Sequence, residues 1–123
     1  MAGSYKDLGA SKQAMELALE IYRFTESFPK EEKYRLTSQL RRAAVSVPSN
    51  IAEGKGRCTD KELLLFLHHA RGSLLEVETQ LLISQGLKYG FEDQSEADRL
   101  LSLVENLAKT LNALIKSLRA NAA

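Results

Sequence analysis

Hydrophobic residues that recur at steps of three and four are the feature that most constrains this chain. They do so in four separate stretches, and no stretch shows the period-two alternation typical of a half-buried strand. The last stretch keeps the pattern throughout, in Ala97, Leu101, Val104, Ala108, Leu111, Ile115 and Leu118. A helix with such an apolar seam needs a facing helix. The spacing therefore predicts an all-α four-helix bundle.

Capping and turn residues separate the four stretches. Pro29 suits the first turn of a helix, and Thr59-Asp60-Lys61-Glu62 has the pattern of a capping box, as Asp93 with Glu96 does more weakly. We expect the second helix to close at Gly54 and Gly56 and the third at Gly86 and Gly90. These signals predict helices at about 11–28, 30–54, 60–88 and 94–120, within a few residues. Short connections imply antiparallel neighbours, so we expect one domain over residues 1–123 with up-down-up-down topology.

Pro48 interrupts the second stretch, because proline removes one backbone hydrogen bond and crowds the preceding turn. The apolar pattern continues on both sides of it, which predicts a kinked helix. The polar side chains of Ser46, Ser49 and Asn50 are available to the freed backbone groups. Two interpretations stay open: the kink improves packing, or it shapes a functional surface.

The third and fourth stretches hold more leucines than one seam requires. The surplus is Leu64, Leu65, Leu75 and Leu82 in the third, and Leu100, Leu103, Leu107 and Leu114 in the fourth. A helix that is apolar on several sides must be buried on several sides. The surplus either joins the core or forms a subunit interface. We favour the interface, and hence a symmetric homo-oligomer.

Residue patterns for catalysis or metal binding are sparse. Leu65 and Phe66 stand three positions before His68 and His69, so the Glu-x-x-His pairs of a di-iron bundle are missing. Cys58 is the only cysteine, and no histidine or acid adjoins it in the sequence, so we treat it as incidental. We expect no enzyme activity, no metal and no cofactor.

One catalytic alternative rests on His68-His69-Ala70-Arg71-Gly72-Ser73. This string resembles the phosphotransfer-histidine motif of four-helix histidine phosphotransfer domains, with Arg71 where lysine is usual. In that interpretation an exposed His68 carries the phosphoryl group and the basic residue stabilises it. In the competing structural interpretation, Gly72 lets two helices approach closely and the histidines are partly exposed.

Neither the chain start nor any apolar run predicts a membrane association. Met1-Ala2-Gly3-Ser4 lacks the apolar run of a signal peptide, and no segment approaches the roughly 20 apolar residues that span a bilayer. The single thiol fits a reducing compartment. We expect a soluble, cytoplasmic protein.

Charge is segregated along the chain although the formal net charge is only +1. Residues 30–61 hold eight basic and four acidic side chains, whereas residues 92–105 hold five acids against Arg99. Arg41, Arg42, Lys55 and Arg57 are therefore candidates for contacts with nucleic-acid phosphates. An ordinary solvated face is the alternative. Symmetry would repeat a modest basic patch around an oligomer and strengthen its potential.

Several strings resemble one protein family. They are Tyr5-Lys6-Asp7-Leu8, Phe28-Pro29, residues 36–44, the string Ser46-Val47-Pro48-Ser49-Asn50-Ile51-Ala52-Glu53-Gly54, and Phe66-Leu67, residues 70–74 and Glu76 in the third helix. They resemble the four-helix-bundle proteins encoded in intervening sequences of bacterial 23S ribosomal RNA genes. The string over residues 46–54 is highly specific, and together the matches cover nearly the whole chain. The Ala-Arg-Gly-Ser element fits this family's own pattern, which weakens the phosphotransfer alternative.

The resemblance implies a bacterial protein that forms a homopentameric, barrel-like assembly. It also implies kinship to the accessory variability protein of diversity-generating retroelements, a basic pentamer that binds nucleic acid and a reverse transcriptase. Carried over to this chain, Arg41, Arg42, Lys55 and Arg57 are the residues expected to bind the polyanion. Asn50 and Glu53 look structural. The expected function is thus a non-catalytic pentamer that binds RNA or DNA or scaffolds a reverse-transcriptase-like partner, with phosphotransfer at His68 as the alternative.

Overall fold

A computed structural model describes residues 5–90 and 94–122 of the chain. Over these residues it contains four α-helices, one short 3-10 helix and no strand. The helices are α1 (Tyr5–Thr25), α2 (Leu36–Lys55), α3 (Asp60–Gly86) and α4 (Gln94–Ala122), and the 3-10 helix η1 covers Lys30–Glu32. The predicted all-α fold is confirmed.

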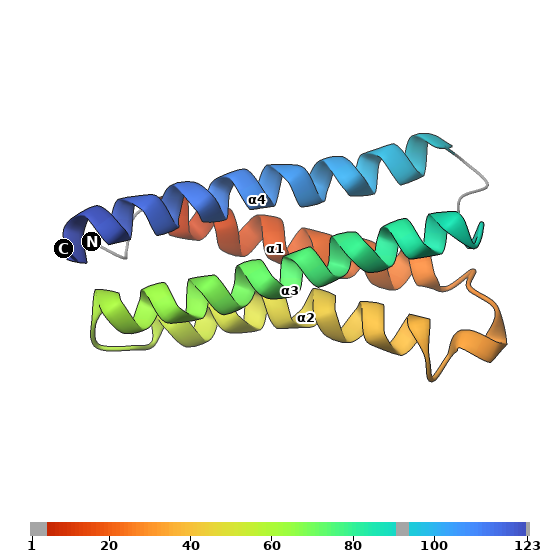
Figure 1. The fold of residues 1–123 in the computed structure, drawn as a ribbon, viewed down its shortest axis with the longest axis horizontal. Coiled ribbons are helices and arrows are strands. Elements are labelled where there is room, and N and C mark those ends of the chain that lie inside the picture. Colours follow the sequence, from red (N-terminus) through yellow and green to blue (C-terminus); the bar gives the residue numbers. More distant parts are fainter. Residues whose placement is uncertain (1–4, 91–93, 123) are drawn as a thin grey trace.

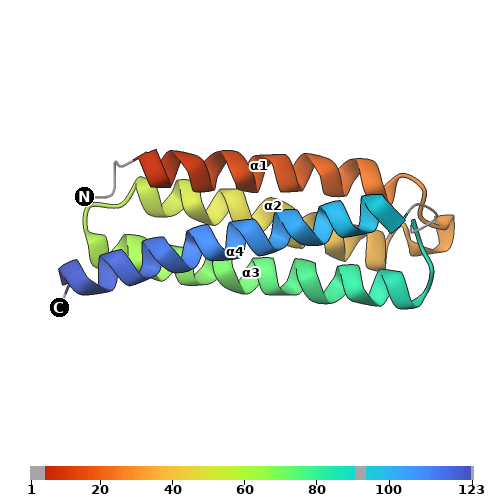
Figure 2. The same ribbon diagram turned by 90° about the horizontal axis from the view of Figure 1, so that it is seen from above.

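The four helices form an elongated antiparallel bundle (Figures 1 and 2). α1 packs against α2 and α4, and α3 packs against the same two helices, so each helix has two neighbours. This is the predicted up-down-up-down arrangement. No helix of the described part is long and apolar enough to cross a membrane.

The first helix is longer at its start and shorter at its end than the predicted range of about 11–28. It begins at Tyr5 because its buried seam extends back beyond Ala14 to Ala10. It ends at Thr25, whose hydroxyl donates to the Ile21 carbonyl at 2.8 Å. Phe28 lies beyond the helix and is still buried, with its ring 5.4 Å from that of Phe24.

The second helix begins at Leu36, not at about residue 30 as predicted. No aliphatic residue lies between Phe28 and Leu36, so residues 30–35 have no apolar face to bury and form only η1 and a turn. Glu32 stabilises this turn, because its carboxylate accepts from the Leu36 amide at 3.4 Å and from the Tyr89 hydroxyl at 3.0 Å. The Tyr89 pKa is raised by that bond to Glu32 and by burial.

Two glycines act through close packing. Gly54 does not end α2 as predicted: it is a buried helical residue, and a Cβ there would lie 2.9 Å from side-chain atoms of both Leu63 and Phe66 in α3. Gly56 is the residue that caps α2. Gly90 has a φ of 68°, and a Cβ there would lie 2.8 Å from the Phe24 ring.

The start of α3 is capped as predicted, since the Thr59 hydroxyl accepts from the Glu62 amide at 3.1 Å. The expected cap of α4 at Asp93 falls outside the described residues. α2 runs through Pro48, and the Asn50 side chain donates to the Ser46 carbonyl at 2.9 Å.

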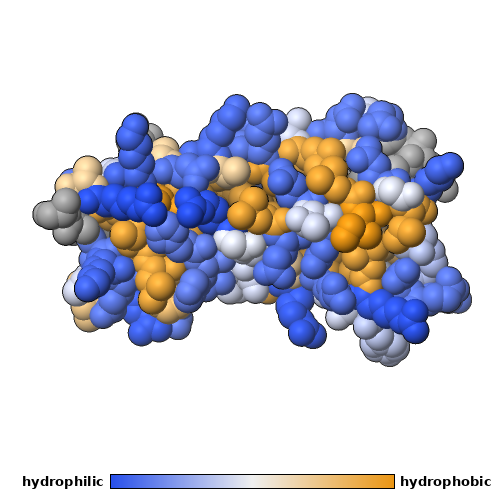
Figure 3. All heavy atoms as spheres, viewed as in Figure 1, coloured by the Kyte–Doolittle hydropathy of each residue, from blue (hydrophilic) through white to orange (hydrophobic). Residues whose placement is uncertain are grey.

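The surplus leucines behave differently in the two last helices. Leu100, Leu107 and Leu114 of α4 are buried in the core, and Leu103 and Leu64 pack against it, so their assignment to a second face was wrong. Leu65, Leu75 and Leu82 of α3 remain about half exposed. Apolar side chains accordingly appear among polar ones along the face on which α3 runs (Figure 3).

Candidate nucleic-acid interface

The predicted residues Arg41 and Arg42 line a hollow of about 360 Å³. The other lining residues are Tyr22 near the end of α1, Lys33 and Tyr34 in the turn before α2, and Thr37 and Ser38 in the first turn of α2. We call this set of seven residues the basic hollow. It brings three cationic side chains and two aromatic rings together.

Arg41 is positioned in the basic hollow by contacts with α1. Its Nε donates to Thr25 Oγ1 at 2.8 Å and its Nη2 donates to the Tyr22 carbonyl at 3.3 Å. Its guanidinium also stacks on Tyr22, 4.7 Å from the ring centroid. All of these partners are neutral. The Arg41 charge is therefore positioned without being neutralised.

The mouth of the basic hollow is open and cationic. Arg42 and Lys33 are exposed, and the Tyr34 ring is 85% exposed. The Lys33 ammonium lies 5.4 Å from the centroid of that ring. An exposed ring beside cations is the arrangement on which unpaired bases stack while their phosphates are neutralised.

Thr37, which lines the same hollow, carries a buried polar atom without a partner. The residue is only 7% exposed, and its Oγ1 has no hydrogen-bond partner among the described residues. A buried hydroxyl without a partner costs roughly 1–3 kcal/mol. Thr37 is the second residue of α2, where the helix dipole favours negative charge. A ligand oxygen in the hollow would lie near this helix start, whereas the Oγ1 atom itself is buried beneath the surface.

Lys55 and Arg57 do not join Arg41 and Arg42. Fourteen residues of helix separate Arg41 from Lys55, about 21 Å along α2. Lys55 Nζ lies 3.4 Å from Ser11 Oγ. Arg57 forms an ion pair with Glu53 at 2.8 Å and stacks on Phe66. The four predicted residues thus do not form one site: Arg41 and Arg42 share the basic hollow, Lys55 lies apart from it, and Arg57 is partly neutralised by Glu53.

The sequence interpretation overlooked the aromatic half of the basic hollow. Tyr34 stands between Lys33 and Arg35, an interleaving of basic and aromatic residues that was visible in the sequence. Tyr22 gave no such signal, because only the packing of α1 on α2 places it beside Arg41.

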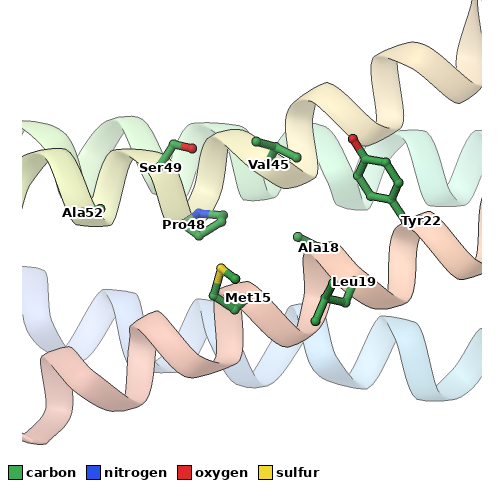
Figure 4. Close-up of a pocket in the computed structure, with 8 residues that line it drawn as sticks. All are labelled: Met15, Ala18, Leu19, Tyr22, Val45, Pro48, Ser49 and Ala52. Carbon is green, nitrogen blue, oxygen red and sulfur yellow. The ribbon is translucent and has the colours of Figure 1, made fainter.

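An apolar groove between α1 and α2 adjoins the basic hollow. It has a volume of about 500 Å³ and is lined by Met15, Ala18, Leu19, Tyr22, Val45, Pro48, Ser49 and Ala52 (Figure 4). Tyr22 lines both features. Met15 and Leu19 on α1 and Val45 on α2 are each more than 40% exposed. Pro48 therefore lines a surface groove, and both interpretations of its place in α2 stay open.

His68, the residue of the phosphotransfer alternative, lies between two guanidinium groups. Arg71 Nη2 is 3.1 Å from its Nδ1 and Arg119 Nη2 is 3.2 Å from its Nε2. Burial and these two cations lower the His68 pKa. A Cβ on Gly72 would meet nothing within 4 Å. The expectation that this glycine allows a close helix contact was therefore wrong. Nothing in this geometry favours phosphotransfer.

Other candidate chemistry is limited. The described residues contain no group of three His, Cys, Asp or Glu side chains placed to hold a metal ion. Cys58 is an exposed free thiol.

Known proteins resemble this chain in sequence and in fold. Residues 6–113 match the family model of the 23S rRNA-intervening sequence proteins. The chain belongs to this family. A solved structure from Bacteroides thetaiotaomicron, a protein of unknown function from the S23 ribosomal protein family, has the same fold, with a TM-score of 0.76 and 21% identity. That similarity covers 90% of this chain and 98% of the other. A comparison with curated proteins finds no match.

Proposed function

We propose that this 23S rRNA-intervening sequence protein is a non-catalytic homo-oligomer that binds RNA or DNA through the basic hollow. The observation that carries the proposal is the composition of that hollow: three cations and two aromatic rings meet near the start of α2. Phosphate contacts supply affinity and aromatic stacking accommodates any base. The protein works in the cytoplasm without a cofactor or metal, and a reverse-transcriptase-like protein is its candidate partner.

Two separate apolar surfaces support the assembly. One is the groove between α1 and α2, and the other is the outward side of α3 with Leu65, Leu75 and Leu82. When two different surfaces of one chain complement each other, copies associate head to tail and close into a ring if the rotation allows. We propose that these surfaces meet in a pentamer. Each protomer then contributes one basic hollow to a ring of positive potential.

Nucleic-acid binding is tested by fluorescence anisotropy with a labelled single-stranded RNA and the equivalent DNA over a series of salt concentrations. We expect affinity to fall steeply with salt, and Arg42→Gln to reduce the salt-dependence slope by about 0.7–1 because one phosphate contact is lost. Tyr34→Ala should weaken binding by about 1–3 kcal/mol at every salt concentration, since it removes stacking.

Lys109→Gln is the matched control, because it removes one positive charge from an exposed side chain of α4. Equal losses in Arg42→Gln and Lys109→Gln would show that net charge, and not the basic hollow, determines binding. Absence of salt-sensitive binding by the wild type would refute the nucleic-acid role.

Assembly is tested by light scattering. The wild type should run at about five times the chain mass of 13.7 kDa. Leu19→Glu in the groove and Leu75→Glu on α3 should each dissociate it, because a charge would enter an apolar interface, whereas Lys109→Glu should not. A wild type of 13.7 kDa would refute assembly and leave the nucleic-acid proposal to its own experiment.

A further inference from the structure

A second cationic cluster lies between α3 and α4, away from the basic hollow on α1 and α2. His68 and Arg71 come from α3, and Arg119 comes from the last turns of α4, 51 residues further along the chain. One guanidinium nitrogen approaches each ring nitrogen of His68, at 3.1 Å from Arg71 and 3.2 Å from Arg119. Three nitrogen-bearing side chains thus meet at the α3–α4 interface, with one arginine on each ring nitrogen of His68.

Hydrogen-bonding chemistry leaves this cluster unsatisfied. A neutral imidazole has one acceptor nitrogen and one N–H, and a guanidinium can only donate. Whichever tautomer His68 adopts, one guanidinium therefore faces a ring N–H, and in the protonated ring both do. A group that accepts from all three side chains would remove this conflict.

The cluster also lacks a counter-charge. Among the described residues neither Arg71 nor Arg119 forms an ion pair with a carboxylate, and Arg71 Nη1 instead donates to the neutral Asn112 Oδ1 at 3.1 Å. On the other side of α4, by contrast, Arg99 binds Glu20 at 2.6 Å. The Asn112 contact orients the Arg71 guanidinium across the α3–α4 interface without neutralising it.

We infer that Arg71, Arg119 and His68 form a binding site for a phosphate group. Its oxygens can accept from both guanidinium groups and from a His68 N–H, which replaces donor-to-donor contacts with charge-assisted hydrogen bonds. The phosphate can be free or belong to a nucleic-acid backbone. The inference does not rest on the proposed function, since the basic hollow shares no residue with this cluster.

The surface beside His68 has room for such a ligand. A hollow of about 390 Å³ there is lined by Lys61, Glu62, Leu64, Leu65 and His68. Lys61 adds a further cation, and Glu62 is the acid among these lining residues. Leu64 presents apolar surface on which the organic part of a phosphate ester can lie.

The test is a titration of the full chain followed by NMR of the His68 ring nitrogens. One arm uses inorganic phosphate and the other a single-stranded RNA. We expect saturable shifts of both His68 nitrogens, with at least a tenfold loss of affinity in Arg119→Gln and in Arg71→Gln. Lys12→Gln, the same charge change on α1, should bind as the wild type does.

The two arms distinguish the sources. Saturation by inorganic phosphate identifies a site for free phosphate groups, and saturation by RNA alone identifies a backbone phosphate; both support the inference. Absence of a shift with either probe, or equal binding by wild type and Arg119→Gln, would overturn it. Arg42→Gln should leave the inorganic-phosphate arm unchanged, which separates this site from the basic hollow.

Proton linkage gives an independent readout. The titratable and charged groups around His68 are Arg71, His69, Lys61 and Glu62 on α3 and Arg119 on α4. Burial, the two arginines and His69 lower the His68 pKa in the free protein. A bound phosphate would raise that pKa, so the affinity for RNA, whose phosphodiesters do not titrate in this range, should rise as pH falls toward the His68 pKa of the free protein. His68→Gln should abolish this rise. An unchanged pH dependence in His68→Gln would contradict the role given to the ring.

Discussion

α3 and α4 carry the same surplus of leucines and place it differently. In α4, Leu100, Leu107 and Leu114 are at most 5% exposed, whereas Leu65, Leu75 and Leu82 of α3 are at least 50% exposed. Both helices contact two neighbours, so the number of partners does not explain the difference. The position of the leucines around each helix does.

Helix geometry separates the two sets. Leu100, Leu107 and Leu114 alternate with Val104, Leu111 and Leu118 at steps of four and three, so they widen one continuous apolar arc. Leu65 follows the buried Leu63 by two residues, which at about 100° per residue directs it roughly 160° away. Surplus apolar residues thus indicate an exposed face only when they lie outside the arc of the main seam.

The largest expected effect comes from truncating one leucine in each helix. Leu107→Ala should lower the free energy of unfolding by about 2–5 kcal/mol, because it leaves a cavity in a fully buried site. Leu75→Ala should change it by less than about 0.5 kcal/mol in the isolated chain. Urea denaturation over a range of protein concentrations measures both. A similar, concentration-independent loss in the two variants would remove the distinction between the helices.

Two glycine replacements test the same contrast. Gly54→Ala adds a methyl group to α2 where it faces α3, and Gly72→Ala adds one to the exposed side of α3. Gly54→Ala should destabilise the fold by about 1–3 kcal/mol, because its Cβ would lie 2.9 Å from Leu63 and Phe66 where α2 crosses α3. Gly72→Ala should stabilise it by about 0.5–1 kcal/mol, because the new Cβ meets nothing and alanine favours a helix. Thermal unfolding gives both signs. A destabilising Gly72→Ala would mean that this side of α3 is covered.

The sequence predicted what depends on local patterns. The seam of α4 and the Thr59 cap of α3 needed only neighbours in the chain. Gly54 was misread as a helix end, because its close approach to α3 depends on how two helices cross. For the same reason, the sequence did not reveal Tyr22 in the basic hollow or Arg119 in the cluster with His68. Tyr22 meets Arg41 across 19 residues, and Arg119 meets His68 across 51, and neither register is encoded in a local pattern.

The smallest expected effect tests how α4 is held at its two edges. At its edge toward α1, the α1 carboxylate Glu20 binds Arg99 of α4 and Arg23 of α1, at 2.6 Å each. At its edge toward α3, Arg119 of α4 lies against His68 of α3. The bond to Arg99, with the charges of Arg99 and Arg23, lowers the Glu20 pKa. Because the Glu20 pKa is lower in the folded state, its ion pairs contribute their full stability at pH values above the unfolded-state pKa of about 4.3. This stability is lost as pH falls through the folded-state pKa.

Glu20→Gln should therefore cost only about 0.5–1 kcal/mol at neutral pH, because the Arg99 and Arg23 side chains are 53% and 65% exposed and solvent screens the pairs. In urea denaturation, the difference from wild type should shrink as pH falls below about 4.3 and vanish below the folded-state pKa of Glu20. Glu105→Gln, which breaks a looser 3.4 Å pair with Lys109, should cost less at every pH. If Glu20→Gln and Glu105→Gln gave identical pH profiles, the ion pairs at the α1 edge of α4 would not contribute measurably to the free energy of unfolding. The two edges of α4 would then differ only in Arg119, which faces α3 and forms no ion pair among the described residues.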